Sequence, residues 1–147
     1  MLALVWRYIG QENQGTGAGY FEFAIDDLRW SIYGIIHANG DPDGGDPRTI
    51  YFTSLDPDDH YDRIYVNAPD DDCNFYGCVF LNADRLLYLV TSSGGALREV
   101  EVHNCSLSGS NYSGLYAYNR IQLFLVDSEV FSCNQNGVVL NGNEEEI

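Results

Sequence analysis

This 147-residue sequence contains no lysine, and its positive charge comes from arginine alone. Seven Arg face 22 Asp and Glu, which gives a formal net charge of -15 at pH 7 and a pI near 4.1. Proteins that bind nucleic acids or anionic membranes rely on Lys and Arg to neutralise phosphates. The sequence therefore predicts that neither is a partner. The acidity itself fits solubility, a salty habitat or cation binding.

Long apolar runs and metal-binding cysteine motifs are also missing. No apolar stretch approaches the roughly 18 residues of a membrane-spanning helix, and the apolar residues 1–6 are too few for a signal peptide. The four cysteines lack the two-residue spacing of zinc sites, and their disulfide state is open: Cys73, Cys78, Cys105 and Cys133. We expect a soluble, secreted or surface-associated protein with no signal peptide in this sequence.

The residues that are present predict one folded domain over 1–147. The hydrophobic share is 45% and the aromatic share 14%, with 11 Tyr, which is too apolar for a disordered chain. A chain of this length buries about two thirds of the surface that it exposes when unfolded. It can therefore form a sizeable core.

A repeat occupies the C-terminal part of the sequence, where residues 100–117 correspond to residues 123–140. Apolar residues recur there at every second position, which is the period of a β-strand. Asn, Gly and Ser separate the short runs and favour turns. The corresponding pairs are Val100 and Leu123, Val102 and Leu125, Asn104 and Asp127, Cys105 and Ser128, Leu107 and Val130, Asn111 and Asn134, Gly114 and Gly137, Leu115 and Val138, and Ala117 and Leu140.

The direction of the repeat distinguishes a solenoid from a hairpin. The second strand of a hairpin would read in mirror order, whereas this order repeats in the same direction. That predicts successive coils, with matching residues stacked at about 4.8 Å. An earlier coil aligns at a shift of 27, with four extra residues placed in Thr91–Ala96: Cys73 on Val100, Phe75 on Val102, Gly77 on Asn104, Cys78 on Cys105, and Phe80 on Leu107.

With these coils, the sequence resembles right-handed parallel β-helix proteins of the pectate-lyase-like superfamily. Gly77, Asn104 and Asp127 would form the stacked tight turn of that family, and Asn111 with Asn134 a second turn. The resemblance extends to the N-terminal segments, where we expect a first strand, an amphipathic capping helix and a following strand: LVWRYIG (4–10), FEFAIDDLRWSIYGII (21–36) and DPRTIYF (46–52). An apolar stripe supports the helix: Phe21, Ala24, Ile25, Leu28, Ile32 and Ile35.

The predicted fold is thus an all-β, right-handed parallel β-helix of about four irregular coils with an N-terminal capping helix. Residues 1–48 would form the first strand, the helix and an acidic loop, and residues 49–147 the coils. Cys78 and Cys105 would stack inside adjacent coils as a reduced pair, because parallel stacking holds β-carbons too far apart for a relaxed disulfide. The last coil has no cap, which suggests a homo-oligomer or a fragment of a longer β-helix.

One sheet of the predicted solenoid presents a neutral aromatic surface. Its outward residues include the candidate ligand-binding residues Tyr88, Tyr116, Tyr118 and Asn141. Stacked tyrosines can lie against sugar rings or anchor a protein partner. A loop of the same chain can equally cover them, and both alternatives stay open.

Catalytic and metal sites receive weaker support. The resemblance implies a polysaccharide lyase or glycoside hydrolase, but the aromatic sheet carries no charge, and such hydrolysis needs two carboxyl groups. The remaining acidic candidates are Glu99, Glu101, Asp127 and Glu129, for which a solvated surface is the alternative. Asp41, Asp43 and Asp46 could begin a Ca²⁺ loop, although the bidentate Glu of such loops is missing and plain turns fit equally.

The function that we expect is therefore non-catalytic. A β-helix module of this kind would bind carbohydrate or a protein surface, or serve as a structural part of a cell surface, virion or phage spike. The alternative is a polysaccharide lyase or glycoside hydrolase.

Overall fold

The fold, seen in a computed structural model, is a parallel β-solenoid. The structure describes residues 4–11, 16–23, 29–33, 36–40, 49–56, 58–67, 73–91 and 96–142, and these contain strands and turns but no helix. No described segment forms a helix suited to crossing a membrane. The strands are β1 (Leu4–Gln11), β2 (Thr16–Phe23), β3 (Arg29–Tyr33), β4 (His37–Asn39), β5 (Thr49–Ser54), β6 (Tyr61–Asn67), β7 (Cys73–Tyr76), β8 (Cys78–Val90), β9 (Arg98–His103), β10 (Ser106–Ser110), β11 (Leu115–Tyr118), β12 (Ile121–Val126), β13 (Glu129–Cys133) and β14 (Val138–Asn141).

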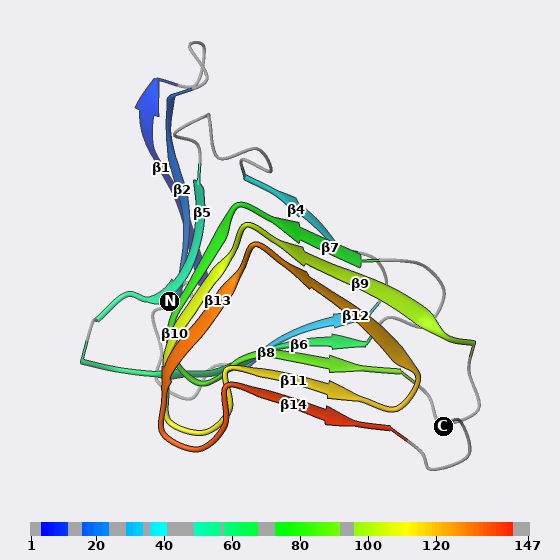
Figure 1. Cartoon of the computed structure of the whole chain (residues 1–147). Coiled ribbons are helices and arrows are strands. Elements are labelled where there is room, and N and C mark those ends of the chain that lie inside the picture. Colours follow the sequence, from blue (N-terminus) through cyan, green and yellow to red (C-terminus); the bar gives the residue numbers. More distant parts are fainter. Residues whose placement is uncertain are drawn as a thin grey trace.

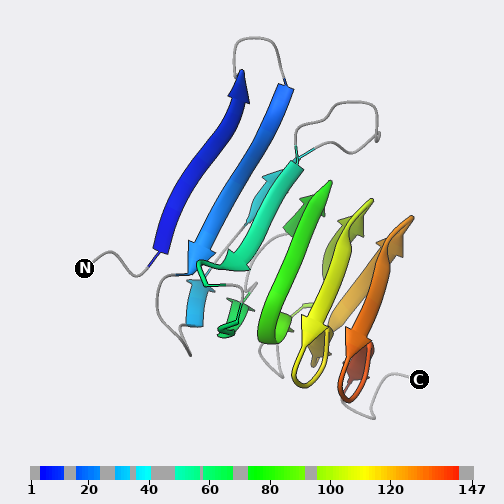
Figure 2. The same cartoon turned by 90° about the vertical axis from the view of Figure 1, so that its left-hand side faces the viewer.

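The coils enclose a triangular cross-section with three faces (Figure 1). Face A contains β2, β5, the first part of β8, β10 and β13, and Figure 2 shows these strands side by side with β1 at the N-terminal edge. Face B contains β4, β7, β9 and β12. Face C contains β3, β6, the second part of β8, β11 and β14. All pairings are parallel except that of β1 with β2.

The strand registers confirm the sequence repeat. Leu107 pairs with Val130 one coil later and with Phe80 one coil earlier. The remaining predicted strand partners of the 23-residue repeat also pair, on faces B and C. Matching positions are therefore vertical neighbours, as the solenoid requires.

The predicted insertion lies in the connection between β8 and β9. Val90 pairs with Tyr118 and Arg98 pairs with Ile121, so 98 − 90 = 8 residues correspond to 121 − 118 = 3, a surplus of five. At the preceding corner, 87 − 83 = 4 residues correspond to 115 − 110 = 5, a deficit of one. The net surplus is four residues, as predicted. It lies in turns, where an insertion leaves the stacked strands in register.

The predicted tight turn is confirmed at the corner between faces B and A. Gly77, Asn104 and Asp127 have φ angles of 59°, 52° and 47°. This left-handed conformation costs most residues about 1–2 kcal/mol, and Gly, Asn and Asp tolerate it best. The turns stack through backbone hydrogen bonds, since the Gly77 N–H donates to the His103 carbonyl at 3.0 Å.

A second left-handed column was not predicted. Asn82, Gly109 and Ser132 have φ angles of 56°, 74° and 52° and stand two residues before the corner that we expected at Asn111 and Asn134. Those two Asn do lie in neighbouring coils, where the Asn134 N–H donates to the Ser110 carbonyl at 3.0 Å. The corner was thus predicted correctly, but the residues with positive φ beside it were not.

The core consists of inward columns along each face. Phe52 and Phe80 stack with ring centroids 4.8 Å apart, and Phe75 meets Phe80 edge-on at 5.6 Å. The fully buried large side chains are Tyr61, Phe52, Phe75, Phe80, Ile64, Leu86, Leu87, Leu89, Leu107, Leu115 and Val66. Period-two alternation puts these residues inside and their polar neighbours outside.

The Cys78 and Cys105 stack is present, and all four cysteines are free thiols. The Cys105 thiol donates to the Phe75 carbonyl at 3.2 Å, and its sulfur accepts the Cys78 N–H at 3.4 Å. Ser128 makes the same contacts one coil later, accepting the Cys105 N–H at 2.9 Å and donating to the Val102 carbonyl at 3.1 Å. The hydrogen bond to Cys105, together with burial, raises the pKa of the Cys78 thiol. The column therefore connects consecutive coils by hydrogen bonds.

The predicted capping helix is wrong. Residues 21–23 belong to β2, and residues 29–33 form β3, which pairs with β6 over its whole length. The sequence of β3, RWSIY, alternates polar and apolar residues and is rich in aromatic and β-branched side chains, which favours a strand. The helical stripe was a coincidental spacing that this pairing overrides. The predicted first strand is confirmed by β1, and the predicted strand after the helix is confirmed by β5 for residues 49–52, while residues 46–48 lie outside the described residues.

The number of coils is also lower than predicted. About three complete turns are present rather than about four, namely β5–β6–β7, β8–β9 and β10–β11–β12. Strands β2–β3–β4 stack before the first of these turns and β13–β14 after the last.

The C-terminal end of the solenoid, formed by β12, β13 and β14 and called the last coil below, exposes inward positions that the preceding strands bury. Leu140 is 67% exposed, whereas its column neighbours Ala117 and Leu89 are 3% and 1% exposed. Leu125 is likewise 38% exposed although its partner Val102 is fully buried. Among the described residues, nothing stacks on this coil, so its apolar cross-section faces outward.

Candidate functional site

Face C carries a column of stacked tyrosines. Tyr65, Tyr88 and Tyr116 pair directly across β6, β8 and β11. The Tyr65 and Tyr88 ring centroids are 5.7 Å apart, and those of Tyr88 and Tyr116 are 4.7 Å apart with an interplanar angle of only 1°. Tyr33 and Tyr118 extend the aromatic surface at its two ends, at 6.3 Å from Tyr65 and 6.5 Å from Tyr116.

The orientation of these rings decides what the column offers to a ligand. Adjacent rings at the strand spacing cover each other's facing sides, so Tyr88, between Tyr65 and Tyr116, has no free ring face. The ring edges and hydroxyl groups of Tyr65, Tyr88 and Tyr116 are therefore what this column presents. Rings arranged in this way cannot each stack on a sugar, because that contact needs a free ring face.

A column of arginines lies beside the tyrosines. Arg29 pairs with Arg63, and Arg63 pairs with Arg85, across β3, β6 and β8. The Arg29 guanidinium carbon is 5.7 Å from the centre of the Tyr65 ring, and that of Arg63 is 5.3 Å from the centre of the Tyr88 ring. Such cation–π contacts stabilise the pair by about 0.5–1 kcal/mol at exposed sites.

Arg85 joins this column to the neighbouring corner. Its guanidinium carbon is 5.9 Å from the centre of the Tyr88 ring and 5.0 Å from that of Tyr112. Three like charges directly opposite each other across strands destabilise a sheet. Stacking on tyrosine compensates part of that repulsion while leaving the charge in place.

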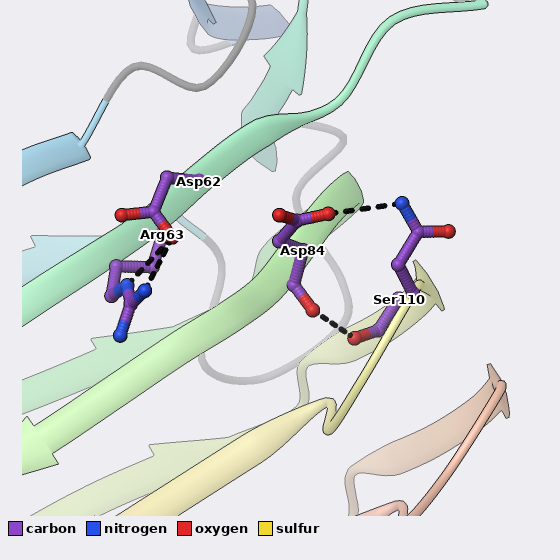
Figure 3. Close-up of polar contacts among 5 residues, drawn as sticks. Asp62, Arg63, Asp84 and Ser110 are labelled. Atoms are coloured by element: carbon purple, nitrogen blue, oxygen red, sulfur yellow. Dashed lines mark hydrogen bonds and ion pairs between the residues drawn. The ribbon is translucent and has the colours of Figure 1, made fainter.

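Two aspartates border the arginine column, and Figure 3 shows both. Asp62 forms an ion pair with Arg63, with a shortest N–O distance of 2.6 Å. The Asp84 carboxylate instead accepts a hydrogen bond from the Asn111 amide at 3.0 Å, and its backbone carbonyl accepts one from the Ser110 hydroxyl at 2.9 Å. Within the described part of the chain, Arg85 has no carboxylate at ion-pair distance. Among the described residues of this surface, three arginines thus stand beside two aspartates, which leaves a net positive charge in a strongly acidic protein.

The surroundings of Tyr88 favour the neutral form of its phenol. Desolvation by burial, with a smaller effect of Tyr116, raises the pKa of Tyr88, although Arg85 and Arg63 oppose this shift. The hydroxyl of Tyr88 is therefore a neutral group that can both donate and accept hydrogen bonds.

Face C brings together all four residues that the sequence suggested for ligand binding. Tyr88 stacks on Tyr116, Tyr118 lies two residues further along β11, and the Asn141 amide donates to the Tyr116 hydroxyl at 3.1 Å. Tyr65 and the arginine column were not predicted from the sequence. Their signal is an Arg followed by a Tyr two or three residues later, as in RIY (63–65) and RLLY (85–88).

The acidic candidates lie elsewhere. Glu99 and Glu101 are on β9 in face B, opposite Gln122 and Phe124 of β12 as expected, and the Tyr76 hydroxyl donates to the Glu101 carboxylate. Asp127 and Glu129 are separate from this pair. Asp127 occupies the left-handed turn, and Glu129, on face A, accepts a hydrogen bond from the Ser106 hydroxyl at 3.0 Å.

No metal site is formed by the residues that the structure describes, since none of them group three or more His, Cys, Asp or Glu side chains around a common point. The suggested Ca²⁺ ligands Asp41, Asp43 and Asp46 lie outside the described residues.

Comparison with protein-family models, with curated proteins and with solved structures found no match to this chain. The parallel β-solenoid therefore stands on the strand pairing of the chain itself.

Proposed function

We propose that this chain is a non-catalytic β-helix module that binds a protein partner through face C. The observation that carries this proposal is the ring geometry of Tyr65, Tyr88 and Tyr116, in which adjacent rings cover each other's facing sides and Tyr88 is covered on both faces. Ring edges, hydroxyl groups and guanidinium groups suit hydrogen bonding and close packing against another protein. The relation to pectate-lyase-like proteins and the location at a cell or virion surface are parts of the same proposal.

The composition of face C supports a protein partner. Protein interfaces are enriched in Tyr and Arg and depleted in Lys, Glu and Asp, and their strongest contacts come from Trp, Tyr and Arg. The outward positions of β11 and the adjoining end of β8 are Tyr88, Val90, Tyr116 and Tyr118, none of which is charged. The aspartates of this side occupy the corner, beside the arginines.

Carbohydrate binding is a second candidate, favoured by the rings at the two ends of the aromatic surface. Tyr33 is 74% exposed and Tyr118 is 37% exposed, so a sugar could stack there. Polysaccharide cleavage has weaker support: Glu99 and Glu101 lie two residues apart on the outer side of β9, but the Glu101 carboxylate already accepts a hydrogen bond from the Tyr76 hydroxyl, and Glu129 is on face A. Convergent carboxyl groups are what such chemistry needs.

Site-specific photo-crosslinking tests the proposal. A photoreactive phenylalanine analogue at Val90 or Tyr118 samples face C, and the same analogue at Gln122 samples face B. In extract of the source organism, we expect a discrete protein adduct from the face C positions alone, identified by mass spectrometry and lost with Tyr88→Ala and Tyr116→Ala together. Circular dichroism confirms that this variant is folded.

Two outcomes would reject protein binding. One is an equal set of adducts from face B and face C. The other is the absence of any face C adduct together with saturable binding of a glycan, which would favour the carbohydrate candidate. Release of reducing or unsaturated sugar ends would instead support an enzyme.

A further inference from the structure

The arrangement of face C points to the kind of element that docks on it, an inference that rests on the proposed function. We infer that the partner contributes an amphipathic α-helix aligned with the solenoid axis. An acidic stripe of this helix lies over Arg29, Arg63 and Arg85, and an adjacent apolar stripe lies over Tyr65, Tyr88 and Tyr116.

The spacing of the two columns favours a helix over an extended chain. Successive arginines stand one strand apart, so Arg29 and Arg85 are separated by two steps of about 4.8 Å, or roughly 10 Å. A helix stripe at i and i+7 advances about 10.5 Å at 1.5 Å per residue. Same-side residues of an extended strand advance about 6.7 Å per step, so two steps give about 13 Å. The helix therefore matches the columns within about 1 Å, whereas the strand exceeds them by about 3 Å.

The sides of the two columns fix which stripe of the helix lies where. Arg63 and Tyr65 are two residues apart on β6, so both point outward from the same strand. The same relation, widened by a β-bulge, holds for Arg85 and Tyr88 on β8. Charge and aromatic surface thus form two parallel lines, which is the pattern that an amphipathic helix complements with carboxylates beside apolar side chains.

Charge complementarity supports an acidic rather than a basic helix. Arg29 and Arg85 have no ion-pair partner among the described side chains, whereas Arg63 forms an ion pair with Asp62. The net charge of -15 opposes an acidic ligand at long range, but the Debye length is about 8 Å at physiological salt, so the adjacent arginines dominate on contact. Bidentate Arg–carboxylate contacts then supply direction as well as attraction.

The helix needs little length. The strands that carry arginine or stacked tyrosine are β3, β6, β8 and β11. They span three strand spacings of about 4.8 Å, roughly 14 Å, which corresponds to about 10 helical residues. A designed helical peptide of this size can therefore reproduce the contact without knowledge of the natural partner.

The experiment measures binding of fluorescein-labelled, stapled 14-residue helices to the full chain at physiological salt by fluorescence anisotropy. The first peptide carries Glu at i, i+4 and i+7 with Leu on the adjoining stripe. The second has Lys in place of these Glu, and the third has the first composition with its stripes scrambled. We expect saturable binding of the first peptide only.

Variants of the chain then test the assigned contacts. Arg29→Gln and Arg85→Gln should each weaken binding of the Glu peptide about 3- to 10-fold, in the range of exposed charge contacts. Arg98→Gln on β9 removes the same charge away from face C and should leave binding within about twofold. The double variant R29E/R85E should lose the Glu peptide and gain the Lys peptide, a reversal that general unfolding cannot produce.

The inference is overturned if Glu and Lys peptides bind equally, or if the arginine variants bind the Glu peptide as the original chain does. It is also overturned if an anionic oligosaccharide binds face C and the Glu peptide does not. If no designed helix binds while photo-crosslinked protein adducts still form at Val90 and Tyr118, the helix is wrong and the proposed protein-binding function stands.

Discussion

Replacing Gly114 by alanine tests whether consecutive coils press on each other as the structure indicates. A β-carbon at Gly114 would lie 2.5 Å from Val130 Cγ1, 2.9 Å from Cys133 Sγ and 2.9 Å from the Gly137 carbonyl oxygen. All three atoms belong to the next coil, and one of them is backbone. Something must therefore move to admit one methyl group.

Gly137 provides a matched control, because it holds the same place in the repeat one coil later. Its β-carbon would find no atom closer than 3.7 Å, which is ordinary van der Waals contact. The physical difference is that, among the described residues, no coil follows Gly137. Gly114→Ala and Gly137→Ala thus make the same chemical change against different surroundings.

The expected magnitudes follow from overpacking and from unfolded-state entropy. Inserting a methyl group into a tightly packed site costs about 1–3 kcal/mol, whereas Gly→Ala at a compatible site stabilises by about 0.4–1 kcal/mol. We expect the free energy of unfolding of the two variants to differ by about 2 kcal/mol or more, with Gly114→Ala the less stable. The melting temperatures should differ by roughly 5 °C for a chain of this size.

Urea unfolding followed by far-ultraviolet circular dichroism measures this difference. Equal denaturant slopes for the two variants would show that the same transition is compared. Two outcomes would contradict this prediction: both variants unfolding at the same urea concentration, or Gly137→Ala being the less stable. Either would show that the following coil does not pack against Gly114.

Three further perturbations test other parts of the structure. Leu89→Ala should lower the free energy of unfolding by about 3–5 kcal/mol, because Leu89 is 1% exposed. Leu140→Ala in the same column should lower it by under about 1 kcal/mol, because Leu140 is 67% exposed. Similar losses for the two variants in urea unfolding would contradict the exposed inner side of the last coil. Asn104→Val should be less stable than Asn104→Gly by about 1–2 kcal/mol, since residue 104 has a φ of 52°; equal thermal melts would refute a left-handed turn there. Burial raises the pKa of Tyr61 above its ordinary value of 10.0, so the fold favours the neutral phenol, and that stability is fully present below pH 10 and lost as the pH rises further. Above pH 10, unfolding titrations of the original chain should therefore lose up to about 1.4 kcal/mol per pH unit more than those of Tyr61→Phe, and parallel pH curves would exclude Tyr61 as a buried titrating group.

The solenoid and its register could be predicted because they depend on a local rule that repeats. Each coil needs apolar residues at alternate positions and a residue tolerant of positive φ at its corner, and both are visible in the alignment of residues 100–117 with residues 123–140. Stacking then follows, since only parallel superposition brings Leu107 onto Val130 and Asn104 onto Asp127. The insertion between β8 and β9 could be predicted for the same reason.

The N-terminal segment could not be predicted in the same way. Between residues 21 and 36, apolar residues satisfy a helical spacing and a strand spacing at once, and no aligned repeat distinguishes them. The choice is made by β6, whose edge offers backbone hydrogen-bond partners to Arg29–Tyr33. Such a partner is remote in sequence, so local propensity did not reveal it.

The candidate site was predicted in part for a related reason. Tyr88, Tyr116, Tyr118 and Asn141 fall on aligned positions of the repeat, and the sequence therefore placed them on one face. Arg29 comes from β3, Arg63 and Tyr65 come from β6, and Arg85 comes from β8. The alignment of β6 with β8 is interrupted by a bulge between Arg63 and Ile64. A shift of one residue within a strand reverses the side on which a residue lies, so the face occupied by Tyr65 and the arginines could be assigned only from the strand register.

The sequence by itself determined that this chain winds into stacked parallel strands, because the repeat, the alternation of apolar residues and the turn residues all act over a few neighbouring positions. Only the tertiary structure decided that the N-terminal segment joins the solenoid as strands and that tyrosine and arginine form two parallel columns on one face. Both depend on pairing between distant segments, whose hydrogen bonds and ring contacts exist only once the coils are in register.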